Sequence, residues 1–322
     1  MNQQKLFIGS NAPFWHNGGS ISTRSRHVIL AALPAVALGV YQYGLPALGV
    51  LTFSMSCAML WECLMSYVVR RPISIDDGDA AVIGLLFGML LPATTPWWLI
   101  VVGTFVAIII GKEIYGGIGC NPLNPVLVAM AIITLSWKEL LDFNGTLVNY
   151  DLGFDMIYPL YVAKKVSIEA ASGYPLFGLL LGKQSGGIGS TFGLGLIIGG
   201  IYLMLRGYIR WEISLSFLAG IFITAWIFNL ASPDQYAGPV FHLLTGYTLI
   251  AAFFLLPENS SSPVNFLPML LYGIGAGVLT MLIRNIGVFV DGTIFAVLMF
   301  NIANPLLDKI RPKAVGRSMD YA

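Results

Sequence analysis

The chain has 322 residues, of which 57% are hydrophobic and 10% are charged, and its formal net charge is +1. A soluble domain carries about a quarter charged residues, so this composition excludes a soluble globular protein and indicates an integral membrane protein. The near-zero charge argues against nucleic-acid binding, which needs clustered Lys and Arg. Cys57, Cys63 and Cys120 have no CxxC or zinc spacing, so neither a disulfide framework nor a self-contained metal site is expected.

The chain opens with a polar leader, residues 1–27, that is expected to lie along the cytoplasmic surface and is not a signal peptide. Because a full crossing needs about twenty apolar residues, the shorter of the apolar segments that follow are expected to be tilted or broken helices. Ten segments are predicted as spans: 28–44, 46–69, 80–91, 97–110, 123–135, 192–205, 213–230, 240–256, 266–283 and 292–307.

The distribution of positive charge predicts the topology. With both termini in the cytoplasm, most of the 17 Lys and Arg residues fall on the cytoplasmic side, as the positive-inside rule requires. Only Lys138, Lys164, Lys165, Lys183 and Arg284 fall outside. Arg284 follows the ninth span, and its side chain is expected to snorkel to the interface.

Two short apolar segments indicate a repeat. Residues 80–96 (AAVIGLLFGMLLPATTP) and 250–263 (IAAFFLLPENSSSP) both stop at Leu-Leu-Pro and continue through small polar residues to another proline. They are the third and eighth spans, so halves of 28–136 and 191–308 with five spans each would be inserted with opposite topology. Proline-stopped segments at matching positions of inverted repeats point to a midplane binding site. Chance similarity of apolar segments is the alternative.

The stretch GKEIYGGIGCNPLNP, residues 111–125, separates two apolar runs. Its glycines, among them Gly116 and Gly117, allow close backbone approach, and its prolines break a helix. Irregular backbone at membrane depth is tolerated only where protein covers it or where it lines a cavity. One interpretation is a tight cytoplasmic turn with a helix N-cap at Asn121 or Asn124. The other is that these two amides face a polar ligand.

Several carboxylates require a reason. Glu62 lies in the middle of the second span, where a charge costs about 2.5–3.5 kcal/mol, so it either pairs inside the bundle or faces water. Asp76, Asp77 and Asp79 precede the third span, where capping is favoured and a cation role is the alternative. Glu62, Asp77 and Asp79 are the candidate ion pathway.

Other polar residues suggest no chemistry. Asp291 and Asp308 flank the last span and are interpreted as interfacial. His16, His27 and His242 are scattered, so no histidine metal site is proposed. The outer loop, residues 137–190, is too long for a plain connection and is expected to be functional or disordered.

Taken together, these stretches resemble one family, the RnfD component of the Rnf ion-translocating electron-transport complex, related to the NqrB component of the sodium-pumping NADH:quinone reductase. The resemblance rests on DGDAAVIGLLFGMLLP with TPWW, GKEIYGGIGCNPLNP, GGIGSTFGLGLIIGGIYL, AAFFLLPENSSSP and RNIGVFVDGTIFAVLMFNIANPLLD. It implies an all-α fold of ten transmembrane helices in two inverted halves, similar to ammonium and urea channels. It also implies a bacterial or archaeal cytoplasmic (inner) membrane location, and partner subunits that include a flavin-bearing extracytoplasmic subunit and iron–sulfur subunits.

One departure from the family concerns its covalent flavin. The family usually carries Asp-x-x-Ser-Gly-Ala-Thr-Pro-Leu in the outer loop, and the threonine binds FMN through its phosphate. Here residues 169–176 read EAASGYPL, without a threonine. No phosphoester FMN is therefore expected, and a flavin is expected to be held non-covalently around Ser172, Gly173 and Tyr174 by stacking on the tyrosine. Thr191, in the next glycine-rich turn, is a distant alternative acceptor.

The resemblance further implies a second, non-covalent flavin, riboflavin in the quinone-reductase relative, near Asn121 and Asn124 with Gly116 and Gly117. Cys120 is a conceivable iron–sulfur ligand, but one thiol cannot hold a cluster. The expected function is a membrane subunit of a redox-driven pump (Rnf-type ferredoxin:NAD oxidoreductase) that moves Na⁺ or H⁺ as electrons pass by flavin. The alternatives are a redox-free channel for small solutes and a structural anchor subunit.

Overall fold

The computed structural model describes residues 19–72, 75–147, 150, 153, 156–166 and 173–310. Regular structure in these ranges is helical, with no strand among them. The main helices are α1 (Ile21–Tyr43), α2 (Leu45–Val69), α3 (Asp79–Leu90), α4 (Trp97–Phe105), α5 (Pro125–Ser136), α10 (Gly193–Leu205), α11 (Trp211–Ala231), α12 (Pro239–Leu244), α13 (Thr248–Ile250), α14 (Phe266–Asn285) and α15 (Thr293–Leu307). Short helices α6 (Phe143–Thr146), α7 (Pro159–Tyr161) and α9 (Leu176–Leu180) lie in the long loop, with π-helical turns η2 (Val106–Ile110), η5 (Val162–Val166) and η6 (Ala251–Leu255).

Four helical stretches are long and apolar enough to cross a membrane by length and composition: α2, α4 with its continuation to Tyr115, α11 and α14. Helices α3, α5, α10 and α15 are apolar but shorter. Most predicted segments therefore coincide with a helix. The first begins earlier than predicted, at Ile21, because Ser20 caps it by accepting a hydrogen bond from the Thr23 amide at 3.1 Å. The end of the predicted leader is thus part of α1.

The eighth segment, 240–256, is broken, in line with the expectation that some of the shorter segments are tilted or broken helices. Helix α12 ends at Leu244, Gly246 takes a φ of +70°, and the chain resumes at Thr248 as α13 and η6. The hydroxyl of Thr248 donates to the carbonyls of His242 at 2.9 Å and Thr245 at 3.0 Å. These bonds satisfy carbonyls that the break removes from the helical ladder.

Helix α3 ends at Leu90 because Pro92 cannot continue the ladder. Its terminal carbonyls are bonded by the second half of the chain. Leu90 O accepts from the Tyr247 hydroxyl at 3.0 Å, and Leu91 O accepts from the Ile188 amide at 3.0 Å. The glycine-rich turn before α10 thus covers the end of α3.

At the matching Leu-Leu-Pro stop of the second half, a backbone carbonyl is in turn bonded by a residue of the first half. The Leu255 carbonyl, just before Pro257, accepts from Asn124 Nδ2 at 2.8 Å. Each proline-stopped segment therefore has a carbonyl satisfied by a residue of the other half, which ties the two halves together where their helices are interrupted.

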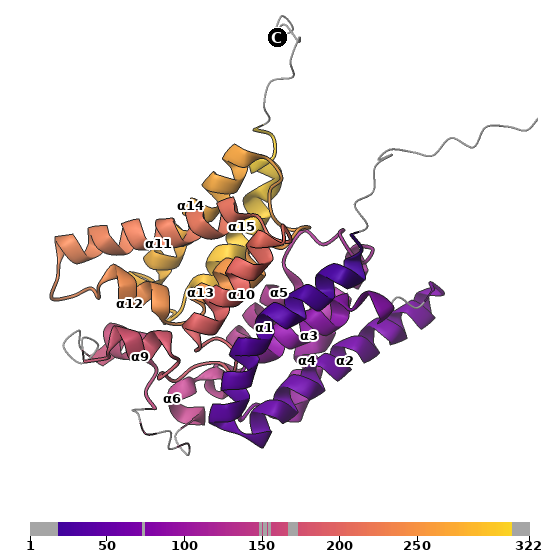
Figure 1. Ribbon diagram of the computed structural model, residues 1–322, viewed down its shortest axis with the longest axis horizontal. Helices are drawn as coiled ribbons and strands as arrows, with labels where there is room; N and C mark the ends of the chain where they lie inside the picture. Colours follow the sequence, from indigo (N-terminus) through magenta and orange to yellow (C-terminus); the bar gives the residue numbers. More distant parts are fainter. Residues whose placement is uncertain are drawn as a thin grey trace, which may run out of the picture.

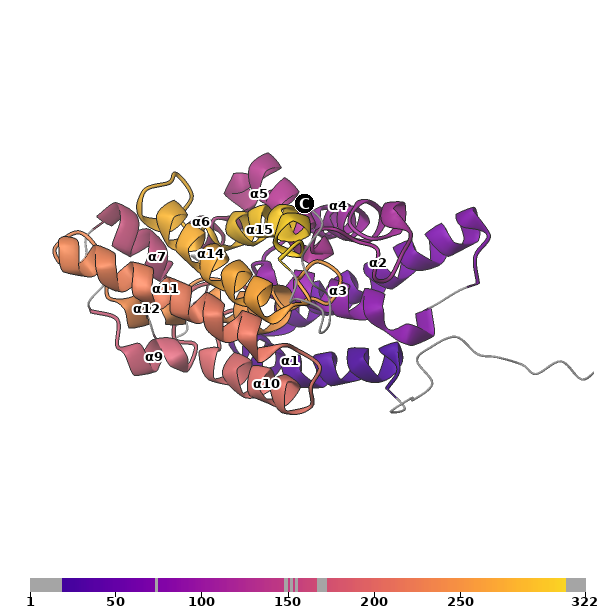
Figure 2. The same cartoon turned by 90° about the horizontal axis from the view of Figure 1, so that it is seen from above.

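The packing of the helices reflects the same division. Helices α2, α3 and α4 pack together, and α11, α14 and α15 form a second group. The first half of the chain meets the second where α1 lies beside α10 and where α5 lies beside α15, which both views show (Figure 1, Figure 2). Small residues allow the closest approach, because a Cβ on Gly277 of α14 would lie 2.5 Å from the Phe217 carbonyl of α11.

Candidate functional site

One hollow with converging polar groups lies where residues 111–125 meet residues 257–260. This hollow, here called the Lys112 cavity, has a volume of about 450 Å³, within the range of small-molecule sites. The residues that matter for its chemistry are Arg24, Asp79, Lys112, Asn121, Asn124, Phe253, Phe254, Glu258 and Ser260.

A buried ion cluster forms one wall. Lys112 is 1% exposed, and its Nζ contacts Glu62 Oε1 and lies 2.9 Å from Asp79 Oδ2. The Glu62 side chain is 2% exposed and that of Asp79 is 27% exposed. Within the described part of the chain, Glu62 Oε2 has no hydrogen-bond partner. We call these three residues the Lys112 cluster.

The cluster contains two of the carboxylates that the sequence singled out, Glu62 and Asp79. Of the two alternatives for Glu62, pairing inside the bundle and facing water, the structure shows the first, and its partner lies at the end of the α4–η2 segment. Asp77 Oδ1 accepts from the Asp79 amide at 2.9 Å, so Asp77 has the capping role expected at the start of α3. Asp79 is placed differently, because it faces Lys112 and lines the cavity.

The opposite wall is built around Glu258. Asn121 Nδ2 donates to Glu258 Oε1 at 2.7 Å, and Ser261 Oγ donates to Glu258 Oε2 at 2.7 Å. Ser260 Oγ lies 2.8 Å from Asn121 Oδ1 and 2.7 Å from Glu258 Oε1. Burial raises the pKa of the Glu258 carboxyl, and the hydrogen bonds from Ser261, Asn121 and Ser260 only partly oppose that shift. The cavity therefore has a proton-binding group beside the Asn121 amide.

Asn124 is the N-cap of α5, as one interpretation of the sequence predicts. Its Oδ1 accepts from the Leu127 amide at 3.2 Å, and its Nδ2 donates to Leu255 O. Its own amide donates to Asn301 Oδ1 at 3.3 Å. Asn124 lines the cavity, but both ends of its amide are bonded within the protein.

The glycines of the same stretch shape the turn. Gly116 and Gly117 have φ values of +117° and +97°, which other residues rarely adopt. The Gly116 carbonyl accepts from Arg71 Nη1 at 3.2 Å. Ile118 and Gly119 line the cavity, whereas Gly116 and Gly117 lie beside it.

The predicted outer-loop residues lie elsewhere. Ser172 is outside the described residues, and Gly173 is exposed. Tyr174 is half-buried, donates to Ile157 O at 3.4 Å and lines a separate, largely apolar hollow of about 440 Å³. Thr191 is buried and lines neither hollow. Of the predicted flavin residues that the structure describes, Asn121 and Asn124 thus line the Lys112 cavity and Tyr174 lines the other hollow, whereas Gly116, Gly117, Gly173 and Thr191 line neither.

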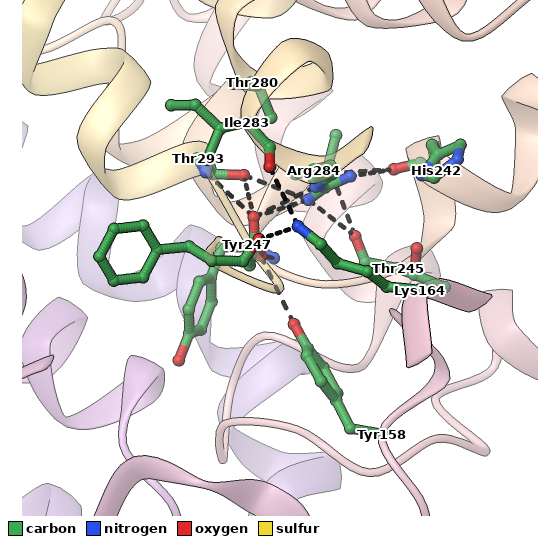
Figure 3. A network of polar contacts seen from close by, with 12 residues as sticks. Tyr158, Lys164, His242, Thr245, Tyr247, Thr280, Ile283, Arg284 and Thr293 are labelled. Carbon is green, nitrogen blue, oxygen red and sulfur yellow. Dashed lines mark hydrogen bonds and ion pairs between the residues drawn. The ribbon is translucent and has the colours of Figure 1, made fainter. Parts of the chain in front are cut away.

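A second buried ion pair contradicts two expectations. Arg284 is 3% exposed, and its Nη2 and Nε lie 2.9 and 3.2 Å from Asp291 Oδ1, so it does not snorkel (Figure 3). Asp291 is not interfacial, because its side chain is 7% exposed and also accepts from Thr293 and Tyr247. Burial alone would raise the pKa of Asp291, but Arg284 and these hydrogen bonds hold it below its usual range. The sequence showed each charge but not that they pair.

Other residues in or next to the cavity were missed, although for two of them a signal existed. The spacing Asn-x-x-Asn-Pro occurs at 121–125 and again at 301–305. Asn301 and Asn304 donate to the Ser261 carbonyl at 3.0 and 3.1 Å, and Asn301 bonds Asn124. The two copies of the spacing therefore meet at the same turn. Glu258 stood within a stretch recognised only as a repeat.

The geometry defines a class: a helical integral membrane protein with interrupted apolar segments and a buried charged site between them. The chain belongs to the NQR2, RnfD, RnfE family, whose sequence profile matches residues 8–316. It is 31% identical over 316 residues to the D component of the proton-translocating ferredoxin:NAD(+) oxidoreductase complex of Clostridium ljungdahlii, with 95% of each chain covered. It is 32% identical over 317 residues to the D component of the Na(+)-translocating ferredoxin:NAD(+) oxidoreductase complex of Acetobacterium woodii, covering 98% of this chain and 96% of the relative.

A third relative, the D component of the ion-translocating oxidoreductase complex of Halorhodospira halophila, is 32% identical over 330 residues, with 93% of this chain and 92% of the relative covered. The first two relatives are named for different ions at nearly the same identity. Overall similarity therefore does not choose between proton and sodium, and the choice depends on local chemistry.

Proposed function

We propose that this chain is the integral-membrane subunit of an Rnf-type redox-driven ion pump, and that a non-covalent flavin binds in the Lys112 cavity. The observation that carries the proposal is the cavity itself: about 450 Å³, with aromatic and charged walls contributed by both halves of the chain. Its relatives are named as subunits of ion-translocating oxidoreductase complexes, so electron transfer and ion movement belong to the assembled complex.

The residues present fit a flavin. Phe253 and Phe254 supply apolar aromatic surface for a planar ring. Arg24 lines the cavity, and its Nε has no partner in the described ranges, so it is available to a carbonyl oxygen of a ligand. Asn121 and Glu258 present an amide and a carboxyl at the opposite wall. A flavin bound there would supply redox chemistry that the side chains around it do not.

The Lys112 cluster is suited to couple charge in the cavity to an ion. Two carboxylates face one ammonium, and Glu62 Oε2 is unsatisfied by the described residues. In a poorly solvated site, an added negative charge must be compensated by a cation or a proton. Asp79 is the exposed member and the entry point from the cavity, and Glu62 is the buried member that retains the ion. Asp77 positions Asp79.

The proposed setting follows the sequence expectations. The chain has ten spans in two inverted halves with both termini cytoplasmic, and it assembles with iron–sulfur subunits and an extracytoplasmic flavin-bearing subunit. The reciprocal closure of the Leu-Leu-Pro stops supports the inverted relation. The outer loop carries no phosphoester FMN, because its acceptor threonine is absent.

Flavin extraction from the purified complex and from the isolated subunit tests the site. The isolated subunit should retain extractable flavin and show no fluorescent band in a denaturing gel. Asn121→Ala and Phe254→Leu should lower the flavin content several-fold, whereas Tyr41→Leu, at a position that is 87% exposed, should not. Loss with Tyr174→Leu instead would assign the flavin to the outer-loop hollow. If the subunit contains no flavin, the remaining functions are the two alternatives, a redox-free channel and a structural anchor subunit.

Ion coupling is tested separately in proteoliposomes containing the whole complex. Glu62→Gln should keep electron transfer but lower ion transport at least tenfold, because the amide cannot carry the compensated charge. Glu139→Gln, at an exposed position, is the control. Unchanged transport in Glu62→Gln would exclude the Lys112 cluster from the ion pathway.

A further inference from the structure

A small hollow beside the Arg284–Asp291 pair is not used by the proposed function. It has a volume of about 70 Å³, and its polar lining residues are Lys164, Gln235, Tyr236, His242, Arg284 and Asn285. A water molecule takes about 30 Å³ of liquid volume, so the hollow has room for a monatomic ion or a few atoms. A flavin, a sugar or a phosphate ester does not fit.

Among the described residues around this hollow, positive charge exceeds negative charge. Lys164 and Arg284 both line it, and Asp291 is the one carboxylate that pairs with Arg284 in the described part of the chain. Lys165 adds a further positive charge next to Lys164. Burial is the main cause that lowers the pKa of Lys164; Lys165 and Arg284 lower it further, and Asp291 opposes them. A cation is therefore repelled from this position.

The lining also has hydrogen-bonding atoms that the described residues leave without a partner. His242 is 4% exposed, and neither of its ring nitrogens has a hydrogen-bond partner among residues that the structure describes. The same holds for Asn285 Nδ2. Arg284 Nη1 donates to the His242 carbonyl at 2.9 Å, so the guanidinium lies directly beside this histidine. Buried donors without acceptors are costly, and an unpaired group of this kind needs an explanation.

Lys164 is held in place by backbone carbonyls. Its Nζ donates to the carbonyls of Ile283 at 3.1 Å and Phe289 at 2.6 Å, and Figure 3 shows it converging on the Arg284 pair from a different element. Two of its three hydrogens are thus directed to the backbone, which leaves one for another acceptor. The ammonium therefore has a defined position.

We propose that this hollow binds a small monovalent anion of the size of chloride, held by His242, Asn285 and Lys164. An anion accepts hydrogen bonds from the unused donors and also neutralises the excess positive charge. A water molecule accepts the hydrogen bonds but carries no charge. Its position beside His242 of α12, near the break before α13, implies that binding stabilises that interruption. The site is separate from the Lys112 cavity, since the 20-residue helix α14, about 30 Å long, connects the two regions.

Thermal unfolding of the purified protein in detergent tests the site. At constant ionic strength and constant Na⁺, replacing gluconate with chloride or bromide should raise Tm saturably, by about 2–4 °C. Lys164→Met and His242→Phe should abolish the rise. Lys165→Met removes a neighbouring charge from an exposed position that does not line the hollow, and should retain it.

Two results would overturn the proposal. An absent anion effect in the wild-type protein would mean that water alone fills the hollow, and equal effects in wild type and Lys164→Met would mean a general salt effect. If His242→Phe does not fold, anomalous scattering from crystals grown in bromide decides the matter. A bromide peak next to His242 and Lys164 supports the site, and a map without one excludes it.

Discussion

The Lys112 cluster and the Arg284–Asp291 pair are built from similar parts but differ in completeness. Each places a buried cation near the end of a long apolar helical segment and against carboxylate; Glu62 lies 50 residues from Lys112, whereas Asp291 lies only 7 residues from Arg284. Asp291 is bonded by Arg284, Thr293 and Tyr247, so it is fully satisfied. The Lys112 cluster has one cation for two carboxylates, an unsatisfied oxygen on Glu62 among the described residues, and a large adjoining cavity.

This difference separates a structural network from one that can change its charge. A buried polar network in which every member is bonded stabilises one arrangement, whereas a partly satisfied network responds to any charge that enters. The Arg284 pair should therefore matter most for stability, and the Lys112 cluster most for ion coupling. The following changes are ordered by expected effect on the free energy of unfolding in detergent.

The largest loss is expected from breaking the Arg284 pair. Arg284→Met or Asp291→Asn should each cost about 3–5 kcal/mol, because the remaining partner is left buried and uncompensated. The exposed Arg26→Met should cost little. Because the pKa of Asp291 is depressed, its stabilisation is present above the unfolded carboxyl pKa and is lost as the pH falls below it. Chemical denaturation at several pH values measures the free energy of unfolding of each variant and its pH dependence. Equal losses for the Arg26 and Arg284 variants would contradict a stabilising role of the Arg284–Asp291 pair.

A smaller loss is expected from Lys112→Met. Asp79 is 27% exposed and the cavity admits water, so the two carboxylates are partly solvated after the change. The expected cost is about 2 kcal/mol, accompanied by loss of ion transport by the complex. Lys138→Met, at an exposed position, is the control. A loss as large as that of Arg284→Met would show that the Lys112 cluster is structural.

Removing the cap of α5 should have a moderate effect. Asn124→Ala loses the bond to Leu127 and leaves the Leu255 carbonyl buried without its donor, at a cost of roughly 1–2 kcal/mol. Ser20→Ala removes the cap of α1 at an exposed position and should cost less. The two variants, compared by thermal unfolding, test whether the link between the halves adds to ordinary capping. Equal losses would indicate capping alone.

The smallest effect is expected from Glu258→Gln and is a change of pH dependence. The folded-state pKa of Glu258 is raised, so the folded protein holds this proton more tightly, and stability falls as the pH rises above the unfolded carboxyl pKa. In Glu258→Gln that part of the decline should be absent, while Asn121 keeps an acceptor. Tm between pH 4 and pH 8 measures it, with Glu139→Gln as control. Identical profiles for wild type and Glu258→Gln would refute the raised pKa.

Much of the fold could be predicted from sequence, because apolar length and proline act locally. The predicted segments match helices at 46–69, 97–110 and 266–283 within a few residues. That some of the shorter segments are broken follows from their length, as segment 240–256 shows, although the position of its break at residues 245–247 was not predicted. The first helix was misjudged because its first turns carry polar residues, which hydropathy alone assigns to a leader.

The site was only partly predictable. Glu62 and Asn124 were recognised because a charge in a span and an Asn before Pro each need a local reason. Lys112, Arg284 and Asp291 were not recognised as buried partners, because nothing in their neighbouring residues distinguishes a buried charge from an interfacial one. Among the residues that the structure describes, Lys112 is paired by a carboxylate 50 residues away, and Arg284 by one just beyond the end of its own helix.

The sequence by itself determined that this is a polytopic helical membrane protein of the NQR2, RnfD, RnfE family, where its helices stop, and which polar residues lie in apolar surroundings. Only the tertiary structure decided which of them meet, as Glu62 does with Lys112 and Asn121 with Glu258. The physical reason is that the cost of burying a charge requires a partner but does not specify one. The partner is chosen by how the helices pack, within one half for Glu62 and Lys112 and between the halves for Asn121 and Glu258.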